Sequence, residues 1–142
     1  MTYPPLSKWK CDKCHTLIET AQEGYTTWRD DDEGRPTGFK IVHQGACDTR
    51  QDASSVALPG FLGADGMANL TSLLTYGPLR SDAGQKGVAN LDEFMDFFRR
   101  LQLPYYEEAR PNFSHHDVID EYREANEVRP YLEDALKDIA SR

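Results

Sequence analysis

Two short motifs in the first third of the chain hold the side chains best suited to bind a metal ion. Cys11 and Cys14 form a CxxC motif, and His43 and Cys47 form a second pair separated by three residues. Zinc in structural sites takes four Cys or His ligands in a tetrahedron, commonly from two such pairs. The four residues therefore predict a Cys3His site for a structural Zn²⁺ ion, with no position left for water or substrate.

The cysteines also admit other interpretations. Residues 11–15 match the CxxCH motif that attaches c-type haem, but that attachment usually requires export and would leave Cys47 without a role. A thioredoxin-like redox pair should begin a helix after a buried strand, whereas a proline-containing, polar segment precedes this motif. His15 is an alternative to His43 as the fourth ligand, although His43 is favoured because three donors in one CxxCH run would have to reach the same ion.

A β-hairpin is expected between the two ligand pairs. Residues 24–28 and 39–43 are rich in aromatic and β-branched side chains, as strands are. Residues 29–38 between them are polar and turn-forming, which favours a hairpin with a long loop, and residues 16–19 could add a short strand. A hairpin between two ligand pairs is the order of elements in a treble-clef zinc finger.

The first third of the chain also resembles a group of small uncharacterised bacterial proteins. The similarity is carried by Lys10-Cys11-Asp12-x-Cys14, by Ile18, by Gly24-Tyr25-x-x-Trp28, and by Ile41-Val42-His43-x-x-x-Cys47-Asp48. In that group a CDxC knuckle and an HxxxCD segment flank a hairpin. The resemblance covers residues 10–48 and implies a metal-binding, treble-clef-type module from a bacterium or phage, without implying an activity.

The rest of the chain has the hydrophobic spacing of short helices. A polar stretch over 48–55 reads as a connecting loop, and helices are expected over 65–76 and 90–101, with Asp65 and Asn90 as caps. Pro130 suits the first turn of a last helix. The buried stripe of the second helix is expected to contain Leu91, Phe94, Met95, Phe98 and Leu101.

These elements predict an α+β fold. Residues 1–50 would form a small zinc-bound β-hairpin module, and residues 51–142 a mostly helical, acidic part that packs against the module as one compact unit. Because a module of this size buries little apolar core, the metal would supply much of its folding free energy.

The chain is acidic, and the charge is unevenly spread. The formal net charge is −8 over 142 residues, which disfavours general binding to nucleic acid or to anionic membranes. Residues 1–50 hold seven basic and eight acidic residues, whereas residues 51–142 hold nine and sixteen. Net charge therefore does not exclude a local nucleic-acid contact through phosphate binding and base stacking by the patch Lys8, Trp9, Lys10 and Lys13.

No other cluster predicts chemistry. Residues 115–117 (His-His-Asp) are interpreted as the polar first turn of a helix, and residues 107–108 (Glu-Glu) and 30–33 (acidic) as solvated positions. No apolar run is long enough to cross a bilayer, residues 1–5 lack the order of a secretory signal, and three cysteines do not suggest a disulfide framework. These observations predict a soluble, cytoplasmic protein.

The preferred functional hypothesis is a non-enzymatic zinc-binding protein that acts through protein–protein contact or regulation. The second hypothesis is a zinc-finger nucleic-acid-binding regulator that uses the patch named above. An enzyme comes third, because no nucleophile–base pair, phosphate-binding loop or open metal position is recognisable in the sequence.

Overall fold

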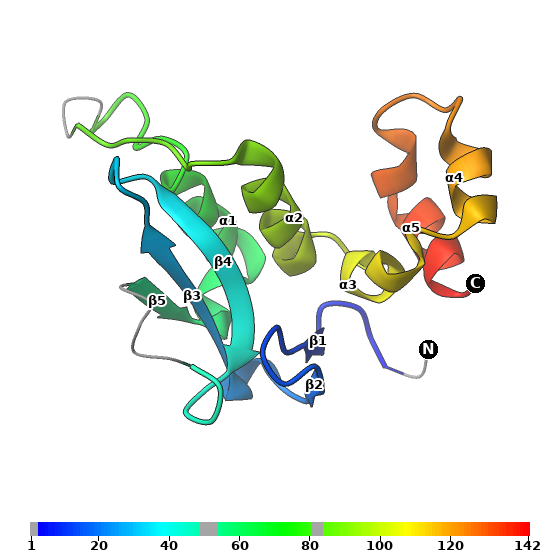
Figure 1. Cartoon of the computed structure of the whole chain (residues 1–142), viewed down its shortest axis with the longest axis horizontal. Helices are drawn as coiled ribbons and strands as arrows, with labels where there is room; N and C mark the ends of the chain where they lie inside the picture. Colours follow the sequence, from blue (N-terminus) through cyan, green and yellow to red (C-terminus); the bar gives the residue numbers. More distant parts are fainter. Residues whose placement is uncertain (1–2, 49–53, 81–83) are drawn as a thin grey trace. The chain divides into compact units, whose positions relative to one another are not determined.

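The computed structural model describes residues 3–48, 54–80 and 84–142 and confirms the α+β prediction (Figure 1). Within these residues the chain forms two small antiparallel sheets and five α-helices. It divides into a sheet unit, Lys8–Gln102, and a helical unit, Leu103–Arg142 with the N-terminal residues up to Ser7. The boundary expected after residue 50 falls inside the sheet unit, because the strand and helices of residues 54–102 group with the hairpin rather than with the later helices.

The sheet unit contains nearly all of the extended structure. A two-stranded sheet pairs β1 with β2, and a three-stranded antiparallel sheet has the order β4-β3-β5. In chain order the elements are β1 (Trp9–Lys10), β2 (Leu17–Ile18), the 3-10 helix η1 (Ala21–Glu23), β3 (Gly24–Asp30), β4 (Pro36–His43), β5 (Ser54–Ala57), the 3-10 helix η2 (Leu58–Phe61), α1 (Gly63–Ser72) and α2 (Leu91–Gln102).

The expected hairpin and the short strand after the CxxC motif are confirmed as β3–β4 and β2. The hairpin loop is shorter than expected, because both strands extend into the polar segment. The connecting loop expected over 48–55 is wrong at its end: Ser54 and Ser55 belong to β5, which pairs with β3. Residues 49–53 of that loop lie outside the described residues.

Helix α1 begins earlier than the capping pattern predicted. Asp65 lies in its first turn and Leu62 occupies the N-cap position. The helix also ends sooner, since Ser72 is its last residue. Within the helix, Leu70 is fully buried whereas Met67 is 40 % exposed.

Helix α2 covers the sheet with an aromatic face. Asn90 caps it as predicted, since its side-chain oxygen accepts the Glu93 N–H at 3.0 Å. The predicted stripe is wrong at Leu91, which is 58 % exposed, and it omitted the buried Phe97. The helix packs against β4, and this contact turns the face containing Phe97 inward. The aromatic core contains Trp28, Phe39, Phe61, Phe94 and Phe97, whose contacting rings lie 5.0–6.4 Å apart.

Two carboxylates cover the backbone along the outer edge of β4. Glu93 of α2 accepts the Gly38 N–H at 2.6 Å, and Asp12 of the CxxC motif accepts the Ile41 N–H at 2.8 Å. An unpaired strand edge otherwise exposes backbone groups to other chains. The second contact brings the CxxC motif to the end of the hairpin, close to His43.

The helical unit has its own apolar core, formed by Tyr106, Ala109, Val118, Leu136 and Ile139. Pro130 lies in a 3-10 helix rather than in the first turn of the last α-helix, which has Leu132 as its N-cap. The elements of the helical unit are α3 (Tyr106–Ala109), the 3-10 helix η4 (Arg110–Asn112), α4 (His116–Tyr122), the 3-10 helix η5 (Arg129–Tyr131) and α5 (Glu133–Ala140).

Candidate metal centre

Cys11, Cys14, His43 and Cys47 converge in the sheet unit. One ligand atom from each residue lies within 4.8 Å of the corresponding atom of every other. The His43 Nδ1 atom is 3.4 Å from Cys14 Sγ and 3.8 Å from Cys47 Sγ. Ligand atoms around a tetrahedral zinc ion are about 3.5–3.8 Å apart, given the usual bond lengths. The four side chains are therefore close enough to hold one metal ion.

The loop between β1 and β2 presents the first two thiols. Cys11 N–H donates to the Thr16 carbonyl at 2.9 Å, and His15 N–H donates to the Cys11 carbonyl at 3.0 Å. His15 has a φ of 66°, the left-handed conformation that lets the chain turn back here. The N–H groups of Lys13 and Cys14 lie 3.4 and 3.5 Å from Cys11 Sγ. The loop thus surrounds one sulfur with backbone donors that favour its thiolate.

A backbone carbonyl fixes the orientation of His43. Its Nε2 atom lies 3.1 Å from the Leu17 carbonyl oxygen, so Nε2–H donates and the lone pair of Nδ1 faces the thiols. Such a bond from the non-ligating nitrogen is typical of metal-bound histidines. No sequence pattern indicates this role of Leu17, because the role depends on the position of β2. In the described part of the chain the cluster contains His43 and not His15.

Cys47 reaches the cluster from a turn. The Cys47 N–H donates to the His43 carbonyl at 3.2 Å, and Gln44 N–H ties the turn to the Glu23 carbonyl at 2.7 Å. His43 and Cys47 are thus joined by a single hydrogen-bonded turn over residues 44–47. Because residues 49–53 lie outside the described residues, assignment to the treble-clef class stays a prediction.

The surroundings of the three thiols shift their pKa values in different directions. Burial alone would raise the pKa of Cys11, but the backbone N–H groups of Cys14 and Lys13 lower it overall. The Thr16 hydroxyl lowers the pKa of Cys14 by hydrogen bonding. Burial, and then the two neighbouring thiols, raise the pKa of Cys47 to about 11. Ionisation of Cys47 is thus unfavourable in this cluster, and a bound divalent cation would supply the charge that favours its thiolate.

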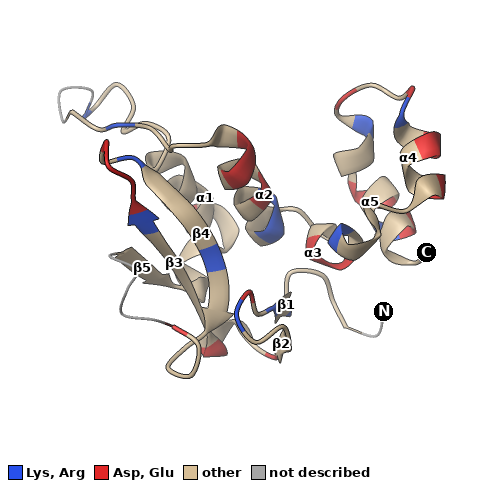
Figure 2. Ribbon diagram, viewed as in Figure 1, with Lys and Arg blue, Asp and Glu red and all other residues tan. Residues whose placement is uncertain are grey.

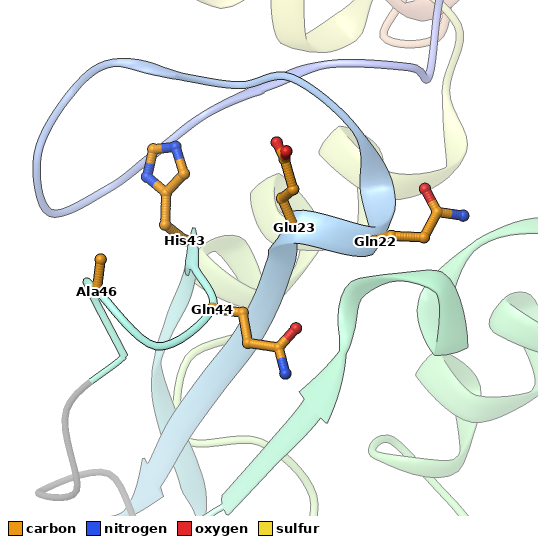
Figure 3. Close-up of a pocket in the computed structure, with 5 residues that line it drawn as sticks. All are labelled: Gln22, Glu23, His43, Gln44 and Ala46. Carbon is orange, nitrogen blue, oxygen red and sulfur yellow. The ribbon is translucent and has the colours of Figure 1, made fainter.

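An open depression of about 470 Å³ lies beside the cluster (Figure 3). It is lined by Gln22 and Glu23 from η1, and by His43, Gln44 and Ala46 from the end of β4 and the following turn. Glu23 and His43 do not form a catalytic pair, because both ring nitrogens of His43 face other groups, the Leu17 carbonyl and the thiols. His43 is therefore not available as a general base in this depression.

The proposed nucleic-acid patch has a buried centre. Trp9 is fully buried, and its indole N–H donates to the Arg100 carbonyl at 2.9 Å, so its ring is not available to stack on a base. Lys8 forms an ion pair with Glu19 at 2.6 Å. Lys10 and Lys13 are exposed, and contact of these lysines with nucleic acid stays a prediction.

The remaining polar clusters have structural partners. Asp117 forms an ion pair with Arg142 at 3.1 Å, and Glu107 pairs with Arg110 at 3.4 Å. The Asp31 carboxylate accepts backbone N–H groups within its own hairpin loop, at 2.9 Å. Asp117 and Asp31 are thus a helix-end group and a turn group, whereas the solvated position expected for residues 107–108 is wrong, because the Glu107 side chain is 8 % exposed and Glu108 is partly buried.

Across residues 3–48, 54–80 and 84–142, no helix is both long and apolar enough to cross a membrane. No protein-family model, curated protein or solved structure matches the chain.

Proposed function

We propose that Cys11, Cys14, His43 and Cys47 bind one Zn²⁺ ion with a structural role. The convergence of these four ligand atoms is the observation that carries the proposal. Three sulfurs and one imidazole suit zinc, whereas calcium and magnesium prefer oxygen ligands. Four protein ligands complete the tetrahedron, so the ion has no open position for catalysis.

The ion would hold the CxxC loop against the end of the hairpin. Strands β1 and β2 contain only two residues each, which is too short for an independently stable sheet. Structural zinc contributes about 10 kcal/mol or more in small zinc modules. This contribution is large relative to the usual stability of a domain, about 5–15 kcal/mol.

We further propose that the protein acts without catalysis, by binding a basic protein partner through its helical unit. Residues 103–142 contain ten acidic and five basic residues, and Figure 2 shows acidic positions along α4. Complementary charge accelerates association and selects partners. The burial of Trp9 counts against the alternative of nucleic-acid binding.

Metal analysis of the purified full chain tests the zinc site. We expect about one zinc ion per chain, and after exchange for cobalt the visible absorption of a tetrahedral, thiolate-rich site. Cys47→Ser should lose the metal, whereas His15→Ala should retain it, because His15 lies outside the cluster. A wild-type protein that takes up no zinc would refute the site, and loss of zinc in His15→Ala would refute this ligand set.

The partner hypothesis is tested separately. Asp120, Glu124 and Glu127 are exposed, and replacing all three by their amides should remove a protein captured from host lysate by the wild type. Capture should also weaken as salt rises. The same preparations should not shift a DNA duplex in a gel. Salt-independent capture, or a salt-sensitive DNA shift, would contradict a basic protein partner.

A further inference from the structure

A buried arginine at the end of α2 faces the metal-binding loop. The Arg100 side chain is 3 % exposed, and its Nη1 atom lies 2.7 Å from Asp12 Oδ2. Its Nη2 atom donates to the Lys10 carbonyl at 3.0 Å. A guanidinium is always charged, and a buried charge needs a nearby partner to offset the loss of water. The residue that supplies the carboxylate lies between the two cysteines of the CxxC motif.

Asp12 connects three parts of the sheet unit. Besides Arg100, its carboxylate accepts the Ile41 N–H at 2.8 Å, and its own N–H donates to the Ile41 carbonyl at 2.8 Å. On the other side of the motif, the buried Trp9 donates its indole N–H to the Arg100 carbonyl. The end of α2 is therefore hydrogen-bonded to three groups of this segment: the Trp9 indole, the Lys10 carbonyl and the Asp12 carboxylate.

We propose that Asp12 and Arg100 are a positioning pair that couples metal binding to the packing of α2. This inference rests on the proposed zinc site. The ion fixes Cys11 and Cys14 and so holds Asp12 between them, where its carboxylate meets the guanidinium. Without the ion the loop is held mainly by the two-residue strands, and its movement would leave Arg100 without this counter-charge.

The coupling works in both directions. If zinc stabilises the Asp12–Arg100 contact, the contact must stabilise bound zinc by the same free energy. Removing an interaction that supports metal ligands typically weakens metal affinity by about 10- to 100-fold. We expect a loss of that size in Asp12→Asn, which keeps the side-chain shape but removes the charge of Asp12 from its contact with the Arg100 guanidinium.

Competition with a chromophoric chelator, using the full chain, measures this change in zinc affinity. Arg100→Met should also weaken binding, and the loss in the double variant Asp12→Asn/Arg100→Met should be smaller than the sum of the two single losses, because both substitutions remove the same contact. Leu70→Ala in α1 is the control for general destabilisation, since Leu70 is fully buried but lies outside these contacts. The two variants are compared under conditions in which their thermal stabilities match. There the loss of zinc affinity should be larger in Asp12→Asn than in Leu70→Ala.

Hydrogen exchange provides a second readout. The Trp9 indole N–H donates to the Arg100 carbonyl at the end of α2. When zinc is removed by a chelator, the exchange rate of this indole proton should rise at least tenfold more than the exchange rates of the backbone amides of β3. Equal acceleration at both places, or equal affinity losses in Asp12→Asn and Leu70→Ala, would overturn the coupling. If the wild type binds no zinc, the proposed function fails; if it binds tightly and Asp12→Asn binds equally tightly, only the coupling fails.

Discussion

Phe97→Ala should destabilise the sheet unit far more than Phe98→Ala. Phe97 is 2 % exposed, and its ring centroid lies 5.0 Å from that of Phe39 on β4 and 5.9 Å from that of Phe61 on η2. Phe98 is only partly buried, and its ring contacts Phe94 of the same helix at 6.2 Å. Only Phe97 therefore joins α2 to two other elements through its ring.

The expected magnitudes follow from burial. Truncating a buried phenylalanine to alanine costs about 3–5 kcal/mol, from lost apolar burial plus the cavity left behind. Because Phe97 is almost completely enclosed, we expect about 4 kcal/mol. In a unit of this size each kcal/mol shifts the melting temperature by about 4–8 °C, so Phe97→Ala should lower it by roughly 15–30 °C. For Phe98→Ala we expect about 1–2 kcal/mol, since less apolar surface is lost.

Thermal unfolding followed by circular dichroism measures the difference. Both variants should be compared at one protein and zinc concentration, because a bound ligand changes the apparent melting temperature. The zinc content of each sample must be checked first, so that metal loss is not taken for lost packing. Equal losses, or a larger loss in Phe98→Ala, would refute the packing of α2 described above.

Three further substitutions test other contacts. Burial raises the pKa of Glu108 above its usual value of 4.5, so its ionised form opposes folding above the raised pKa and this effect disappears below 4.5. Glu108→Gln should therefore raise the melting temperature at pH 7 but not at pH 4; an equal gain at both pH values would contradict this. Gly66→Ala should lower the melting temperature, although alanine favours helices, because the added Cβ meets the backbone of Phe61; an unchanged or higher value would show that α1 can shift. Glu93→Ala removes the acceptor of the Gly38 N–H and should cost about 1 kcal/mol, seen as a lower urea midpoint; no change would mean that water replaces the carboxylate.

Helix α2 shows which features of a helix can be predicted from neighbouring residues and which cannot. Its start was predictable, because a capping residue and the helix it caps are neighbours in sequence. Its buried face was predictable only in part: Phe94 and Leu101 are buried as expected, but Leu91 is exposed and the buried Phe97 was omitted, since these side chains offer overlapping apolar faces around the helix. Contact with β4 decides among them. The Glu93 side chain likewise bonds a strand instead of its own helix end, which no local rule predicts.

The metal site shows the same division. The sequence by itself determined the ligand types, their two close pairs and the hairpin between them, because these depend on side-chain chemistry and on neighbouring residues. Only the tertiary structure brought the pairs together and buried Trp9, and it places in the cluster the histidine that the spacing favoured, His43. It alone joined Asp12 to Arg100 across most of the sheet unit. Contacts between residues so distant in sequence depend on how whole elements pack, and packing leaves no periodic signal in the sequence.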